Sequence, residues 1–73
     1  MVAQLLFDSR RNIYTLDGLD VSINRMLKVL VWNEEKKLAE WIPTRMVYDE
    51  KINQWNLVGL WGFHIAGLYA EFL

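Results

Sequence analysis

The hydrophobic positions of the chain fall into short runs separated by polar turns, and the pattern is clearest over residues 38–58. Residues 41–48 and 55–58 are rich in β-branched and aromatic side chains, and the polar segment 49–54 lies between them. Two such runs joined by a polar segment are typical of a β-hairpin with a longer loop. Apolar side chains occur on both faces of the first run, which indicates a sheet that curls over itself. We expect the rest of the chain to pair with or pack on this hairpin.

The other hydrophobic runs also have β character. Residues 4–8 and 13–16 flank a polar turn and predict a first hairpin. Residues 26–32 and 67–72 alternate their side chains between two faces, so each predicts a single strand. Five or six short antiparallel strands in one domain, residues 1–73, are typical of a small β-barrel of SH3-like or OB-like type.

The segment 20–24 is open to two interpretations. Asp20 or Ser22 could cap a short helical turn, or the segment could be an irregular loop that places Val21 and Ile23 in the core. We favour the loop, because no amphipathic helix of sufficient length follows.

Residues 31–41 contain good helix formers and could also form a helix. Such a helix would have to stop before Pro43 and would have only a narrow apolar stripe. We therefore interpret the charged residues 33–37 as a solvated hairpin tip. Because Pro43 cannot donate to a sheet ladder, we expect it at a strand start, an edge or a bulge, with a bend in the chain.

The chain contains more large apolar side chains than a small core is expected to hide. Of its 73 residues 53% are hydrophobic and 14% aromatic, whereas a chain of this length buries only about 60% of the surface that it exposes when unfolded. We place Trp41 and Trp55 in the core. A second set of rings is expected to form a contact surface for another protein, with the lid of the small core as the alternative. This set is Trp32, Trp61, Phe63 and Tyr69.

Trp61 and Phe63 are the expected centre of this surface, because the loop 59–67 contains three glycines that permit tight turns. The alternative is that the loop folds inward and its rings serve only the stability of the core.

The charge balance argues against general nucleic-acid binding. Eight Lys and Arg against nine Asp and Glu give a formal net charge of −1, so no positive field attracts phosphates. A nucleic-acid-binding barrel is the alternative function if bases stack on exposed rings beside a local basic strip. The cations of that strip are Arg10, Arg11, Arg25 and Lys28. Exposed rings bordered by acidic residues would instead favour a protein partner with a basic face. The acidic residues in question are Glu34, Glu35, Asp49 and Glu50.

No arrangement of side chains predicts catalysis, a cofactor or a metal site. The chain has no Cys, His64 is its only His, and no Ser or Thr lies in a strained nucleophile turn. We therefore expect no enzyme activity, no cofactor and no metal, and a structural or surface role for His64. A structural role is also expected for Arg45, paired with Glu40 or Asp49 or stacked on Trp55.

The sequence favours the cytoplasm. The absence of Cys fits a reducing compartment, and residues 1–8 lack the basic start and apolar length of a signal peptide. The longest uncharged apolar stretch, residues 57–70, is shorter than the ~20 residues of a membrane-spanning helix.

Several segments resemble a known family. They are Trp-Ile-Pro-Thr-Arg-Met at 41–46, Trp-Asn-Leu-Val-Gly at 55–59 and Gly-Leu at 67–68, with the strands at 11–16 and 27–31. Together they resemble a family of short, uncharacterised proteins carried by Gram-positive bacteria and by their phages and conjugative elements. The pattern of that family includes Trp-x-Pro-Thr-Arg and Trp-x-Leu-Val-Gly.

The chain departs from this pattern at Asn56, where the family usually has an aromatic residue, at Glu71, near its terminal Arg, and at the tip 34–37, which looks like an insertion. The resemblance implies a small barrel, a mobile-element origin and no enzyme activity, and it supplies no site residue. We therefore expect a protein-binding module that modulates or inhibits a host (defence) protein in the bacterial cytoplasm. Its partner would be another protein or a second copy of itself.

Overall fold

The computed structural model describes residues 1–73, which form seven β-strands and no helix. The strands are β1 (Ala3–Asp8), β2 (Ile13–Leu16), β3 (Leu19–Asp20), β4 (Met26–Asn33), β5 (Leu38–Asp49), β6 (Gln54–Leu57) and β7 (Tyr69–Phe72). All neighbouring pairs are antiparallel, in the order β3-β2-β1-β7-β4-β5-β6. The predicted all-β class is confirmed, and the hairpin tip at 33–37 is confirmed over the helix.

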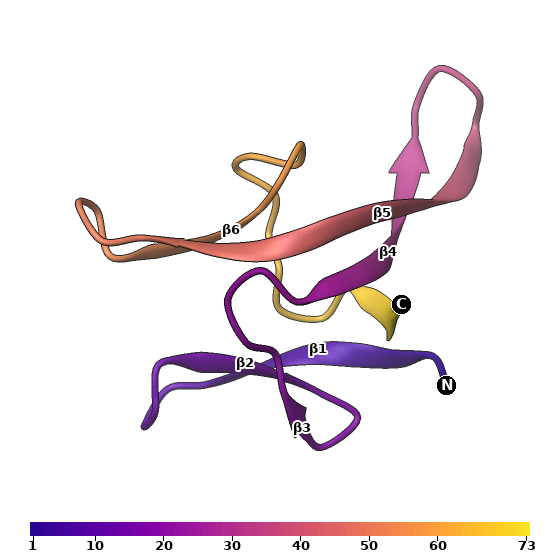
Figure 1. Cartoon of the computed structure of the whole chain (residues 1–73). Coiled ribbons are helices and arrows are strands. Elements are labelled where there is room, and N and C mark those ends of the chain that lie inside the picture. The colour runs from indigo at the N-terminus through magenta and orange to yellow at the C-terminus, as the bar shows by residue number, and fades with distance from the viewer.

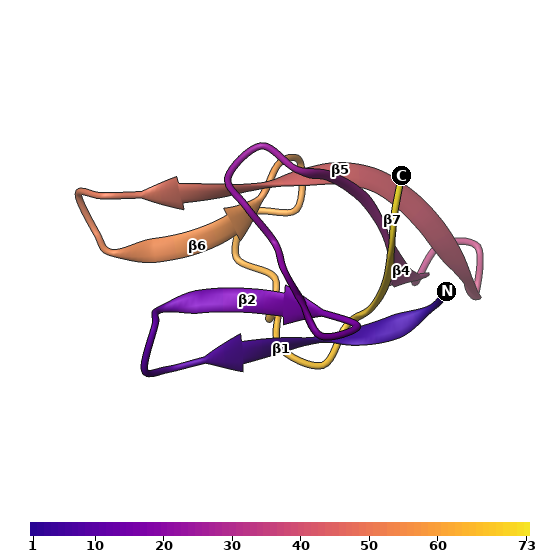
Figure 2. The ribbon, with the colours of Figure 1, turned by 60° about the horizontal axis from the view of Figure 1, so that its bottom comes forward.

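The sheet bends back on itself, so that the β1–β2 and β5–β6 hairpins lie one above the other while β4 and β7 connect them (Figure 1 and Figure 2). The core fills the space between these two layers. It contains nine buried apolar residues, which are Leu5, Leu16, Val21, Leu27, Val29, Met46, Leu57, Ile65 and Ala70. Alternation along the strands directs seven of these side chains to the inner face of the bend, whereas Val21 and Ile65 come from loops.

The backbone ladder does not close into a barrel. The end strands β3 and β6 do not pair with each other, and side chains join the two layers instead. The indole Nε1 of Trp55 donates a hydrogen bond to the carbonyl oxygen of Asn12 at 3.1 Å, and the ring of Tyr14 meets Trp55 edge-on. The observed architecture is thus a strongly bent antiparallel sheet with a seam of side chains along its opening.

Three hairpin turns share one local geometry. Each begins with an Asp or Asn whose side-chain oxygen accepts a backbone N–H two residues further on, as expected of an Asx turn. These residues are Asp8, Asn33 and Asp49. Four positions later each turn contains a residue with positive φ. These residues are Asn12 (54°), Lys37 (56°) and Asn53 (50°). Asn tolerates this conformation and Lys does so less well, so the tip of the β4–β5 hairpin is the strained member of the three.

Strand β5 changes its neighbour part-way along. Residues 38–45 pair with β4 and residues 46–49 pair with β6. The carbonyl of Arg45 accepts the N–H of Val58, which shows that the odd-numbered residues of β5 direct their backbone groups away from β4. Pro43 is one of these residues, so its missing N–H faces a locally open edge. Pro43 is therefore not at a strand start, but the edge interpretation holds.

The core position predicted for Trp41 is wrong. Trp41 lies opposite Leu30 on the outer face of the β4–β5 pair and is 39% exposed, with the Nζ of Lys28 5.1 Å from its ring centroid. Because β5 has apolar side chains on both faces, the sequence does not show which face is buried. The buried face is the one that includes Thr44, whereas Trp41 lies on the other face. Trp55, in contrast, packs against the core as predicted.

The prediction for the segment 20–24, which includes the loop after β3, is confirmed in part. The loop is irregular rather than helical, and Val21 is buried, held by a hydrogen bond from its N–H to the carbonyl of Tyr14 at 2.9 Å. Ile23 is exposed rather than buried, because it lies in the turn that the Arg25 N–H closes onto the Ser22 carbonyl.

Candidate functional site

The loop between β6 and β7 is built from β-turns with glycine in the third position. Their closing hydrogen bonds are Leu60 N to Leu57 O (2.9 Å), Phe63 N to Leu60 O (3.3 Å) and Leu68 N to Ile65 O (3.1 Å). The glycines have the positive φ that the third position of a type II turn requires. These values are 82° for Gly59, 82° for Gly62 and 93° for Gly67. The loop thus contains three turns, each with a glycine in the third position.

This loop directs apolar side chains both inward and outward. Ile65 is a core residue and Leu60 packs against the core. Trp61 occupies the second position of the middle turn and is 62% exposed, and Phe63 is 45% exposed. Both sequence interpretations therefore hold in part, since the loop covers the core with Leu60 and Ile65 while Trp61 and Phe63 are exposed, as predicted.

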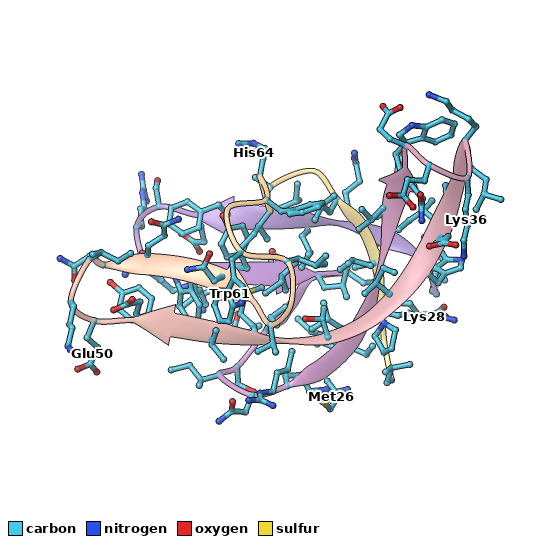
Figure 3. The ribbon with its side chains drawn as sticks, turned by 90° about the horizontal axis from the view of Figure 1, so that it is seen from above. Met26, Lys28, Lys36, Glu50, Trp61 and His64 are labelled. Atoms are coloured by element: carbon cyan, nitrogen blue, oxygen red, sulfur yellow. The ribbon has the colours of Figure 1, made fainter.

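Trp61 lies beside the β5–β6 hairpin, at whose tip Glu50 projects into solvent (Figure 3). It lines a hollow of about 540 Å³, here called the Trp61 hollow. The other lining residues are Val47, Tyr48, Asp49, Glu50, Lys51 and Asn56. Neither Asp49 nor Glu50 forms an ion pair, so two uncompensated carboxylates and one cation, Lys51, border the exposed indole.

Trp32 lines a separate hollow of about 480 Å³ at the tip of the β4–β5 hairpin, and Leu60 from the loop forms its far wall. Three carboxylates border it, those of Glu34, Glu35 and Glu40. Glu40 accepts hydrogen bonds from Lys36 at 2.9 Å and from Asn33 at 3.2 Å, and these hold its pKa below the ordinary value. The carboxylates here are partly compensated, because Lys37 also pairs with Glu34.

Phe63 and Tyr69 lie apart from both hollows. Phe63 lines a third hollow, of about 280 Å³, together with Trp55 and with His64, which lies on the surface as one of the two predicted alternatives (Figure 3). Tyr69 is 51% exposed on β7, opposite Gln4 of β1. The four rings grouped in the sequence therefore do not form one cluster, and no two of them form a ring pair.

The structure instead contains an aromatic cluster that sequence reasoning missed. It runs from one hairpin to the other through Phe7, Tyr14, Trp55 and Tyr48, with successive ring centroids 5.0, 6.4 and 4.8 Å apart. Partial burial raises the pKa of Tyr14. The sequence contains a signal for this cluster, because each of the two hairpins has two aromatic residues that lie opposite each other on one face. This cluster closes the seam of the sheet and is structural.

Two of the four cations proposed for a basic strip, Arg10 and Arg11, lie in the turn between β1 and β2. Arg11 binds Asp8 through its Nε at 2.8 Å and Asp20 through both terminal nitrogens at 3.0 Å. The hydrogen bonds from Arg11 lower the pKa of Asp8. Arg11 is thus neutralised by two carboxylates, and Arg10 is the one of these two residues that has no ion pair.

The other two cations, Arg25 and Lys28, lie against β7. The guanidinium of Arg25 is 4.2 Å from the ring centroid of Phe72, and Lys28 pairs with Glu71 at 3.4 Å. None of the four cations lines a hollow. Arg45 forms neither the ion pair nor the stacking contact predicted for it, and it is exposed opposite Met26 of β4.

No group of three or more His, Asp or Glu side chains is placed to hold a metal ion. The structure has no helix with the length and apolarity needed to cross a membrane.

Comparisons with known proteins find no match for this chain among protein-family models, curated proteins or solved structures. The resemblance to mobile-element proteins therefore stays a prediction, and function has to be argued from the surface.

Proposed function

We propose that this protein is a non-enzymatic protein-binding module, and that the Trp61 hollow contacts a basic face of its partner. The observation that carries the proposal is the exposed Trp61 ring beside the unpaired carboxylates of Asp49 and Glu50. Binding surfaces obtain most of their energy from a few aromatic anchors on rigid supports. The turns of Gly59 and Gly62 provide such a support, so little conformational entropy is lost when a partner covers the ring.

The charge distribution supports a protein partner over nucleic acid. The Trp61 and Trp32 hollows are both bordered by carboxylates, which repel phosphates and attract Lys and Arg. The cations that a nucleic-acid module would need are distributed over two places, and Arg11, Arg25 and Lys28 already have partners within the chain. No observation favours the nucleic-acid alternative.

The family resemblance extends the proposal to the identity of the partner. Proteins encoded by phages and conjugative elements act inside a bacterial host, so we propose a host protein, of a defence system, as the partner that this chain modulates or inhibits in the cytoplasm. The motif similarity at 41–46 and 55–59 supports this step.

The test compares three proteins as baits in a lysate of a Gram-positive bacterium: the wild type, Trp61→Ala and the control Trp41→Ala. Trp41 is also an exposed ring, but it lies on the outer face of β5 and lines none of the hollows. A protein captured by the wild type is purified, and its Kd for each variant is measured by calorimetry. Sedimentation of the bait alone tests whether the partner is a second copy.

We expect Trp61→Ala to weaken binding by about 30-fold, the hot-spot threshold of about 2 kcal/mol, and Trp41→Ala to leave the Kd unchanged. Because Trp61 is 62% exposed, its removal should change the free energy of unfolding by no more than about 1 kcal/mol. Equal binding by a folded Trp61→Ala variant would refute the proposal.

A further inference from the structure

Asn56 is a nearly buried polar residue whose side chain has no partner. Only two polar residues of the chain are buried, Thr44 and Asn56, at 4% and 8% exposure. The hydroxyl of Thr44 donates to the carbonyl of Val58 at 2.7 Å, whereas the amide of Asn56 takes part in none of the hydrogen bonds within the chain. Buried polar groups in proteins are almost always hydrogen-bonded, to protein or to water, so an amide with no partner within the chain is available to water or to a ligand.

The residual exposure of Asn56 lies in the Trp61 hollow. No fully buried side-chain nitrogen or oxygen lacks a partner, so the free amide of Asn56 must reach solvent, and the Trp61 hollow is the only one of the three that it lines. In the register of β5 and β6 it lies opposite Val47, which gives the hollow an apolar floor beside the amide. Trp61 also lines this hollow.

The rim adds acceptors for a cation. One oxygen of Asp49 accepts the N–H of Lys51 at 3.0 Å, which leaves the second oxygen free, and Glu50 makes no hydrogen bond or ion pair. Lys51 is also on the rim, so the three charged groups sum to −1. The hollow thus combines an aromatic face, an apolar floor, a free amide oxygen and an excess of carboxylate.

We propose that the Trp61 hollow binds one arginine side chain of the partner protein. The guanidinium stacks on the indole of Trp61 and donates to the Oδ1 of Asn56 and to the carboxylates of Asp49 and Glu50, while its methylene stem covers Val47. Arginine fits better than lysine because its planar group can stack and donate in several in-plane directions at once, and because it is less strongly hydrated. This inference rests on the proposed function, since the arginine belongs to the basic face of the partner.

The test needs no partner. The ¹⁵N-labelled protein is titrated with N-acetyl-arginine amide, and the indole N–H of Trp61 and the side-chain amide of Asn56 are followed by NMR. N-acetyl-lysine amide and N-acetyl-glutamine amide serve as matched ligands. We expect saturable shifts of both signals with a Kd in the range of about 1–50 mM, as for a single small fragment. Lysine should bind at least about 3-fold more weakly, and glutamine should not saturate.

Variants then assign the contacts. Asn56→Ala and Glu50→Gln should each weaken arginine binding by about 3-fold or more, and Trp41→Ala should not change it. Glu50 is exposed, so Glu50→Gln keeps the test valid even if Asn56→Ala does not fold. The inference is overturned if arginine gives no saturable shift, if the three ligands act alike, or if the shifts lie outside the Trp61 hollow.

The two proposals fail separately. A captured partner whose binding depends on Trp61 while arginine gives no shift would leave the proposed function in place and remove only the arginine site. Saturable arginine binding, together with a partner whose Kd is the same for the wild type and for Trp61→Ala, would support the arginine site and refute the proposed function.

Discussion

Replacing Trp55 by Ala should remove the main connection between the two layers of the sheet. Trp55 lies at the centre of the seam, with Tyr14 on one side, Tyr48 on the other and its indole N–H on the carbonyl of Asn12. No backbone ladder joins the end strands β3 and β6. The side chain of Trp55 therefore connects the two layers where backbone hydrogen bonds would connect them in a closed barrel.

The magnitude follows from three contributions. A tryptophan buries about 150–250 Å², and since Trp55 retains partial exposure we take about 150 Å², or roughly 4 kcal/mol at about 25 cal/mol per Å². The indole hydrogen bond contributes about 1 kcal/mol. Residual burial in the unfolded chain lowers the sum by about 10–40%. The expected loss is therefore about 3–4 kcal/mol, within the usual range of about 3–5 kcal/mol for Trp→Ala in a core.

Equilibrium unfolding in urea, followed by far-ultraviolet circular dichroism, measures this loss. Trp41→Ala is the matched control, because it removes the same side chain from the outer face of β5, where Trp41 is 39% exposed. We expect the control to lose about 1–2 kcal/mol, since only part of its surface is covered and no enclosed cavity is left. Trp55→Phe keeps the ring contacts and loses the hydrogen bond, so it should cost about 1 kcal/mol plus a small packing term.

A loss below about 1 kcal/mol for Trp55→Ala, or a loss no larger than that of Trp41→Ala, would refute this reasoning. It would mean that the two layers are held together by the core residues under β4 and β7 and that the seam contributes nothing.

Three further predictions concern the hairpin tip, the response to alkaline pH and the response to acidic pH. Lys37→Asn should stabilise the protein by about 0.5–1 kcal/mol in the same assay, because Asn tolerates positive φ, whereas the control Lys36→Asn should not stabilise it. Burial raises the folded-state pKa of Tyr14 above 10.0. The neutral form of Tyr14 therefore makes its full contribution to the free energy of unfolding below pH 10.0, and this contribution is lost as the pH rises through the folded-state pKa. Urea unfolding between pH 8 and pH 11 should show this decline, and Tyr14→Phe should reduce it; an equal decline in both proteins would contradict it. At the acid end, hydrogen bonds from Lys36 and Asn33 hold the pKa of Glu40 below 4.5, so their contribution is present above that pH and is lost as the pH falls. Glu40→Gln should flatten this acid decline, and an unchanged profile would show that the pair adds no stability.

The sequence alone was sufficient for features set by neighbouring residues. Alternation and turn residues located β2 at Ile13–Leu16 and the tip at 33–37, because strand period and Asx chemistry act over a few positions. The turns around Trp61 were also predictable from the closely spaced glycines, but the sequence left open whether the loop folds inward, and the structure exposes Trp61.

Only the tertiary structure decided which residues come together across the chain. A strand with apolar side chains on both faces does not reveal which face is covered, so Trp41 and Trp55 could not be distinguished until the sheet was seen to bend. The same bend distributes the four cations over two places and brings the hairpin rings Tyr14 and Trp55 into contact. The free amide of Asn56 was also decided by the tertiary structure, because the loop after β6 places Trp61 at the hollow that Asn56 lines but supplies no hydrogen-bond partner for the amide.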